Sequence, residues 1–184
     1  MHHYSTVIDI LYNPVRYCDK SWVTKSIGPV KNCSLLPAYL KNHFILAHTA
    51  PFPVPEKDTL ESEPVMLFIR NWHKMQRAAF LIGLKLFSAQ IVNSPFFMKS
   101  LSNQQRAFLC LPLPFTSSNV ITNLSDLSHD ALFRAGASFI DSLATEMLPK
   151  ILLVRLRLIF PSSYSYGKDF CESVDKSLSV LKWA

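Results

Sequence analysis

The fold is decided by residues 63–87, which read EPVMLFIRNWHKMQRAAFLIGLKLF. Apolar side chains recur here at spacings of mostly three and four residues, as on one face of an α-helix. Glu63 and Pro64 suit a first helical turn, and Ser62 before them can cap it. We therefore expect one helix over 63–87, with residues 78–84 central in the core. The apolar stripe consists of Val65, Phe68, Ile69, Trp72, Met75, Ala79, Ile82 and Leu86.

Turn and capping signals divide the rest of the chain into further helical segments. Asn13 followed by Pro14 reads as a cap with proline at the first helical position, so two short helices are expected to meet there. Ser102 and Gln105 have the form of a capping box, which opens another helix. The expected helices cover residues 4–27 as two pieces, then about 36–48, 95–98, 102–111 and 126–148, and a last amphipathic segment after Gly167.

The segment 151–160 allows two interpretations. Residues 154–158 alternate with period two, which is typical of a strand. Helical neighbours and the lack of an obvious second strand favour a helix instead. The fold class that we predict is all-α, a single-domain irregular helical bundle.

The length of 184 residues indicates one domain over 1–184, long enough to bury a core without disulfides. Three prolines at alternate positions, Pro51 to Pro55, predict a mobile extended connector over about 49–62. A second linker is expected over about 112–124, where prolines precede a largely polar run.

Hydrophobic residues make up 49% of the chain and charged residues 17%, and the formal net charge is +6. The basic excess reads as mild and spread along the sequence, which indicates a solvated basic surface. An acidic protein partner, an anionic membrane surface and nucleic acid are the alternatives. We expect no signal peptide and no spanning segment, and therefore a cytoplasmic protein.

Residues for chemistry are sparse. The four glycines cannot build a phosphate-binding loop, and the cysteines at 18, 33, 110 and 171 lack metal-binding spacing, so we interpret them as thiols in a reducing compartment. Cys110 with His129 is the one pair that could form a Cys–His nucleophile, and Cys110 reads better as a core residue. Glu61 and Glu63 lie in the expected connector, where a raised pKa is not expected. We predict no enzyme activity, no cofactor and no metal.

A basic stripe lies on the expected central helix. Arg70, Lys74 and Arg77 share a face, which is either a solvated surface or a docking site for an acidic partner or phosphorylated residues. Trp72 fits the core, but an exposed tryptophan beside Arg70 and Lys74 would be a typical interface anchor. The candidate protein-binding residues are Arg70, Trp72, Lys74 and Arg77. The other aromatics lie on apolar stripes, which does not favour nucleic acid.

Three motifs carry a resemblance to a known family. After Trp72 comes Ala79-Phe80-Leu81-Ile82-Gly83, and this segment resembles the tryptophan-containing helix of the OrgA/MxiK/SctK family. Residues 8–17, with Asn13-Pro14 and an aromatic residue three positions later, resemble the family's opening motif. Residues 148–161 are similar to its leucine-rich segment that closes on Phe-Pro. Together the three cover about a quarter of the chain.

This resemblance implies a helical, non-enzymatic adaptor of the type III secretion sorting platform. Such a protein links the cytoplasmic domain of an inner-membrane ring protein to the pod protein, and through it to the stator and ATPase. It would lie in the cytoplasm, peripheral to the inner membrane. The alternative is a type III secretion chaperone that holds an unfolded substrate, although the basic pI argues against it. A small hydrolase and a nucleic-acid binder are the remaining hypotheses.

Overall fold

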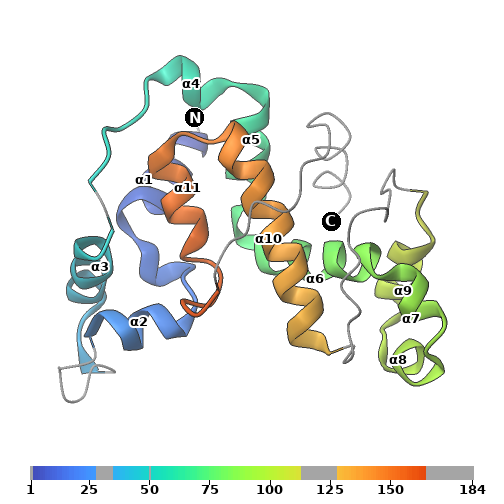
Figure 1. The fold of residues 1–184 in the computed structure, drawn as a ribbon. Helices are drawn as coiled ribbons and strands as arrows, with labels where there is room; N and C mark the ends of the chain where they lie inside the picture. The colour runs from blue at the N-terminus through green and yellow to red at the C-terminus, as the bar shows by residue number, and fades with distance from the viewer. Residues whose placement is uncertain (1, 28–34, 50, 113–127, 165–184) are drawn as a thin grey trace. The chain divides into compact units, whose positions relative to one another are not determined.

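A computed structural model of the chain describes residues 2–27, 35–49, 51–112 and 128–164. The described residues form α-helices and 3₁₀ helices, with no strand among them (Figure 1). The prediction of an all-α fold is therefore confirmed. The helices are α1 (His2–Tyr12), η1 (Pro14–Arg16), α2 (Lys20–Ile27), α3 (Ala38–Ala47), α4 (Lys57–Glu61), α5 (Glu63–Arg70), η3 (Trp72–Lys74), α6 (Met75–Leu86), α7 (Ser88–Val92), α8 (Pro95–Ser100), α9 (Asn103–Cys110), α10 (His129–Met147) and α11 (Lys150–Arg157).

The chain divides into two compact units. One domain over 1–184 stays a prediction. Unit 1 contains the described parts of residues 1–73 and 144–166. Unit 2 contains the described part of residues 74–143. The ambiguous segment after Pro149 is the helix α11, so its helical interpretation is confirmed.

In unit 1, α1 packs against α5 and α11, and α3 packs against α2 and η1. The buried side chains include Ile10, Phe68, Ile69, Leu156 and Phe160. Three hydrogen bonds join α2 and the residue before it to the segment that follows α11. In one of them the backbone amide of Ser162 donates to Ser21 Oγ at 2.8 Å. The indole Nε1 of Trp22 donates to the carbonyl oxygen of Phe160 at 2.8 Å. The backbone amide of Asp19 donates to the carbonyl oxygen of Leu158 at 2.8 Å.

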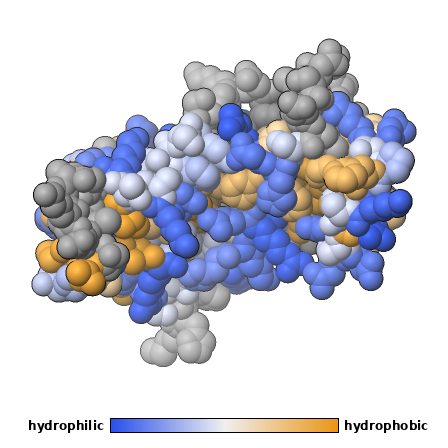
Figure 2. Space-filling model, turned by 90° about the horizontal axis from the view of Figure 1, so that it is seen from below, coloured by the Kyte–Doolittle hydropathy of each residue, from blue (hydrophilic) through white to orange (hydrophobic). Residues whose placement is uncertain are grey.

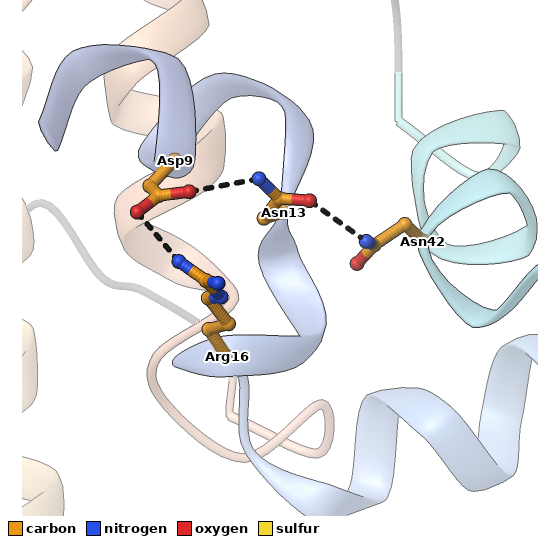
Figure 3. Close-up of polar contacts among 4 residues, drawn as sticks. All are labelled: Asp9, Asn13, Arg16 and Asn42. Carbon is orange, nitrogen blue, oxygen red and sulfur yellow. Dashed lines mark hydrogen bonds and ion pairs between the residues drawn. The ribbon is translucent and has the colours of Figure 1, made fainter. Parts of the chain in front are cut away.

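A polar cluster fixes the junction between α1 and η1 (Figure 3). Asn13 Nδ2 donates to Asp9 Oδ1 at 2.8 Å, and Asn13 Oδ1 accepts from Asn42 Nδ2 at 3.1 Å. Arg16 Nη1 pairs with Asp9 Oδ2 at 2.7 Å. Asn13 precedes Pro14 as expected, but its side chain makes no capping bond. It instead connects α1 to α3, which a local capping rule cannot predict.

In unit 2, α6 packs against α7 and α9, and α7 packs against α8. The capping box is confirmed, because Ser102 Oγ accepts from the amide of Gln105 and the Gln105 side chain accepts from the amide of Ser102. Helices α6 and α10 meet at Gly83 and Gly136. A Cβ atom added at Gly83 would overlap the carbonyl oxygen of Leu132.

The expected single helix over 63–87 is wrong, because the chain leaves α-helical geometry at Asn71. Asn71 has φ −103° and ψ 12°, and its Nδ2 donates to the carbonyl oxygen of Leu67 at 3.0 Å. This side-chain bond competes with helix continuation. Ser62 also makes no capping bond, since its Oγ donates to the carbonyl oxygen of Thr59 at 3.0 Å.

The structure describes most of the first expected linker and almost none of the second. Residues 51–56 have no regular secondary structure, but Lys57–Glu61 within the expected connector form the helix α4. The second linker lies outside the described residues from position 113 onward, as does the last amphipathic segment.

Candidate functional site

The four predicted protein-binding residues do not share one helical face. Arg70 is exposed at the last turn of α5 in unit 1. Lys74 and Arg77 are exposed in unit 2, at the end of η3 and in the first turn of α6. Since the helix breaks at Asn71, the spacing of three and four residues no longer aligns Arg70 with the other two.

Trp72 is a core residue. It is 0% exposed, and its ring packs edge-on against that of Tyr17, with centroids 5.7 Å apart and planes at 89°. Its Nε1 is buried and has no hydrogen-bond partner among the described residues. Burial leaves no surface on Trp72 for a partner, so its assignment as an interface anchor is corrected.

Arg77 lies on the rim of a groove that helices α6 and α9 form in unit 2. The groove has a volume of about 370 Å³. Arg77 Nη2 donates to Gln104 Oε1 at 3.1 Å across the rim. Its lining residues Phe80, Leu81 and Phe108 are buried and form what we call the floor, whereas its polar lining residues Arg77, Ser102 and Gln104 are exposed and form the rim. The lining residues are Arg77, Phe80, Leu81, Ser102, Gln104, Gln105, Ala107, Phe108 and Leu111.

The excess of basic over acidic residues is not spread along the sequence, contrary to the prediction. Six of the nineteen basic residues and none of the thirteen acidic ones lie within residues 64–125. The other thirteen basic residues therefore balance all thirteen acidic ones, and this acid-free segment accounts for the whole net charge of +6. Its cations are Arg70, Lys74, Arg77, Lys85, Lys99 and Arg106.

Three cations of the acid-free segment, Arg77, Lys85 and Arg106, donate hydrogen bonds to neutral acceptors. Lys85 Nζ donates to the carbonyl oxygens of Leu109 and Leu111 at 2.7 and 2.6 Å. Desolvation lowers the pKa of Lys85. Arg106 donates through Nε and Nη2 to the carbonyl oxygen of Leu101, at 3.1 and 2.8 Å. The ion pairs Arg16–Asp9, Lys57–Glu61 and Arg134–Asp130 involve none of these six cations.

A second exposed feature lies on α1 in unit 1. Tyr4, Ile8 and Tyr12 are spaced four residues apart and are 45, 56 and 55% exposed. We call them the α1 stripe. Val7 and Leu11, on a neighbouring face of the same helix, are buried. The missed signal is the second set of large side chains, on a face next to the buried one.

Unit 2 also exposes apolar side chains away from the groove. Val92 at the end of α7 is 62% exposed and Phe96 on α8 is 86% exposed. Figure 2 shows hydrophobic residues at the surface at the α7–α8 end of unit 2.

A buried arginine joins three segments of unit 1. Arg155 on α11 is 7% exposed. Its Nε donates to the carbonyl oxygen of Leu11 at 3.2 Å, and its Nη1 donates to Thr49 Oγ1 at 2.6 Å. Desolvation lowers the pKa of Arg155, and the nearby Tyr17 hydroxyl has its pKa raised by burial. These contacts tie α11 to the ends of α1 and α3.

The candidate nucleophile pair has other neighbours. Cys110 is exposed at the end of α9, so the expectation that it lies in the core is wrong. The His129 ring stacks on Phe80, with centroids 4.1 Å apart. Glu61 accepts from the Tyr4 hydroxyl at 2.8 Å and pairs with Lys57 at 3.7 Å. Within the described ranges, no group of three or more His, Cys, Asp or Glu side chains is placed to hold a metal ion.

None of the helices in the described part of the chain combines the length and apolar character that crossing a membrane requires.

No curated protein and no solved structure matches the sequence. The family of bacterial type III secretion apparatus proteins known as OrgA_MxiK matches residues 7–184. This match covers essentially the whole chain and includes all three motifs that carry the resemblance. The chain therefore belongs to the OrgA_MxiK family of bacterial type III secretion apparatus proteins.

Proposed function

We propose that the chain is a non-enzymatic adaptor of the type III secretion sorting platform. It links the cytoplasmic domain of an inner-membrane ring protein to the pod protein, and so to the ATPase complex, at the cytoplasmic side of the inner membrane. Membership of the OrgA_MxiK family carries this proposal.

The two units support an adaptor with two different surfaces. Unit 1 exposes the α1 stripe, whose aromatic and aliphatic side chains suit a protein contact that buries apolar area. Unit 2 exposes the groove with Arg77 on its rim, which combines apolar area with positive charge. Different chemistry on the two units fits two different partners, and binding would rest on burial and charge complementarity without bond-making.

The experiment is co-purification of the full-length tagged chain from cells that express its secretion apparatus. We expect both the ring protein and the pod protein to be recovered, with loss of one partner when Ile8 is changed to Asp. Ile8→Asp places a charge in the α1 stripe at an exposed position, so the fold should persist. Ala38→Asp adds the same charge at the exposed start of α3 and should leave recovery unchanged.

Two outcomes contradict the proposal. Recovery of neither apparatus protein would remove the adaptor role. Recovery of a single unfolded secreted substrate alone would favour the chaperone hypothesis instead.

A further inference from the structure

We propose that the α6–α9 groove of unit 2 binds an acidic amphipathic segment of a protein partner. Apolar side chains of that segment enter over Phe80, Leu81 and Phe108, and a neighbouring carboxylate pairs with Arg77. The inference rests on the proposed function in taking the partner to be a subunit of the secretion apparatus.

The groove has room for apolar side chains of a partner next to its own apolar lining residues. Phe80, Leu81 and Phe108 form part of its floor and are only 5–8% exposed, so they are already packed within unit 2. The volume of about 370 Å³ lies above them and can take side chains of a partner. A rigid apolar floor with a polar rim is the arrangement in which amphipathic helices bind grooves.

Arg77 provides the charged contact. Its side chain is exposed at the rim, and its described hydrogen bond goes to the neutral amide of Gln104 at 3.1 Å. A guanidinium group presents five N–H donors in a planar fork that matches a carboxylate. A carboxylate offers Arg77 a stronger, charge-assisted bond than the amide does.

The charge of the two helices that line the groove favours an acidic partner. Helix α10, whose His129 stacks on Phe80, carries Asp130 nearby, and that carboxylate is paired with Arg134 at 2.9 Å. No aspartate or glutamate occurs in residues 64–125, so the segment that builds both walls of the groove supplies no carboxylate of its own. Arg77, Lys74 and Arg106 are exposed in this segment of unit 2. An acidic peptide therefore gains charge complementarity, while a basic one is repelled.

The groove does not have the features of a nucleic-acid site. Stacking on bases requires aromatic faces that are accessible to solvent. The Phe80 ring is already stacked on His129, with centroids 4.1 Å apart, so that ring face is not available to a base. A single rim arginine over an apolar floor suits a carboxylate next to apolar side chains.

The test is site-specific photocrosslinking in cells with the full chain and the native apparatus. A benzophenone amino acid replaces Ala107, which lines the groove and is exposed, or Ala89, an exposed alanine of α7 outside the groove lining. Crosslinked peptides are identified by mass spectrometry. We expect position 107, and not position 89, to give a crosslink to a segment with apolar residues at helical spacing and Asp or Glu beside them.

Two charge variants test the role of Arg77. Arg77→Glu reverses the charge, and Gln104→Glu keeps Arg77 but supplies it with an internal carboxylate at nearly the same place as the amide. Both should reduce the position 107 crosslink at least about tenfold. Lys99→Glu changes the net charge as much as Arg77→Glu does, on exposed α8 outside the groove lining, and should reduce it less than about twofold.

The outcomes separate this inference from the adaptor proposal. If both apparatus partners co-purify but position 107 crosslinks to nothing, or to an acid-free segment, the groove assignment is overturned and the adaptor role stands. An equal loss with Lys99→Glu also overturns the Arg77 pairing. A crosslink to an acidic segment of a protein outside the apparatus would keep the groove's preference for acidic segments and overturn the assignment of its partner to the apparatus. Unchanged circular dichroism of each variant shows that the loss does not come from unfolding.

Discussion

Gly83 on α6 and Gly136 on α10 bring the two helices of unit 2 into backbone contact. A Cβ atom added at Gly136 would lie 2.9 Å from the amide nitrogen of Gly83 and would overlap the carbonyl oxygen of Ala79. The atoms in the way belong to the backbone, so no side-chain rotation can relieve the overlap. The two glycines are therefore required by packing and not by backbone conformation.

Replacing Gly136 with alanine should destabilise the protein. Overpacking costs about 1–3 kcal/mol and occasionally more, and a backbone obstacle places this site at the upper end. Helix propensity alone predicts the opposite sign, because alanine is favoured over glycine by about 1 kcal/mol. Urea unfolding followed by circular dichroism measures the change. Ser138→Ala on the same helix is the control, and a midpoint that is unchanged or raised by Gly136→Ala would show that the helices are further apart.

Replacing Arg155 with alanine should destabilise unit 1. The change leaves the carbonyl oxygen of Leu11 and the hydroxyl of Thr49 without this donor, and it removes a buried side chain. Unsatisfied buried groups cost about 1–3 kcal/mol each, so a loss of about 3 kcal/mol is expected. Arg155→Lys should recover only part of it, because an ammonium cannot reproduce the fork that reaches both acceptors. Lys150→Ala, exposed on the same helix, should have almost no effect in the same unfolding assay.

The thiol of Cys18 should react slowly in the folded protein. Burial, and secondarily the neighbouring Asp19, raises its pKa to about 11 from an ordinary value of 9.0. At pH 8 the reactive thiolate is then about a hundredfold scarcer than for an ordinary cysteine. Alkylation with iodoacetamide, followed by peptide mass spectrometry, should show slow labelling in buffer and ordinary labelling in denaturant. Equal rates in the two conditions would contradict the raised pKa.

The same shift predicts how stability depends on pH. The folded state holds the Cys18 proton more tightly than the unfolded state does, so its contribution is complete below pH 9. That contribution is lost as the pH rises through about 11. Cys18→Ala should flatten the stability profile between these values, and a wild-type profile that is already flat there would refute the assignment.

Removing the ammonium group of Lys85 should loosen the end of α9. Lys85→Met keeps the apolar stem but loses the bonds from Nζ to the carbonyl oxygens of Leu109 and Leu111. The side chain is partly exposed, so the expected loss is about 1 kcal/mol. Hydrogen exchange should accelerate at residues 108–111 and remain unchanged in α11, which belongs to unit 1. Uniform acceleration in both would indicate global destabilisation instead.

Local rules predicted the features that depend on a few neighbouring residues. The capping box of Ser102 and Gln105 follows from such a pattern. The period-two alternation of residues 154–158 is instead typical of a strand, and the helix α11 was indicated by its helical neighbours and the lack of a second strand. The break at Asn71 was missed because apolar spacing continues through it, while the side-chain bond to Leu67 that ends α5 leaves no trace in that spacing. Burial of Trp72 against Tyr17 involves residues 55 positions apart, beyond the reach of a local pattern.

The candidate site was only partly predictable for a similar reason. Arg77 stood out as a cation on an amphipathic helix, but its partner Gln104 and the groove arise from packing between α6 and α9. The acid-free segment was readable from the sequence and was missed because the charge was averaged over the whole chain.

The one-sided charge of residues 64–125 gives the two surfaces different responses to salt. At physiological ionic strength the screening length is about 8 Å, so the attraction of the groove for an acidic segment acts only at short range. Raising the salt should slow encounter at the groove, whereas contact through the α1 stripe of Tyr4, Ile8 and Tyr12 should change little. If the two proposed surfaces bind different partners, we expect ionic strength to set which partner the chain meets first during assembly.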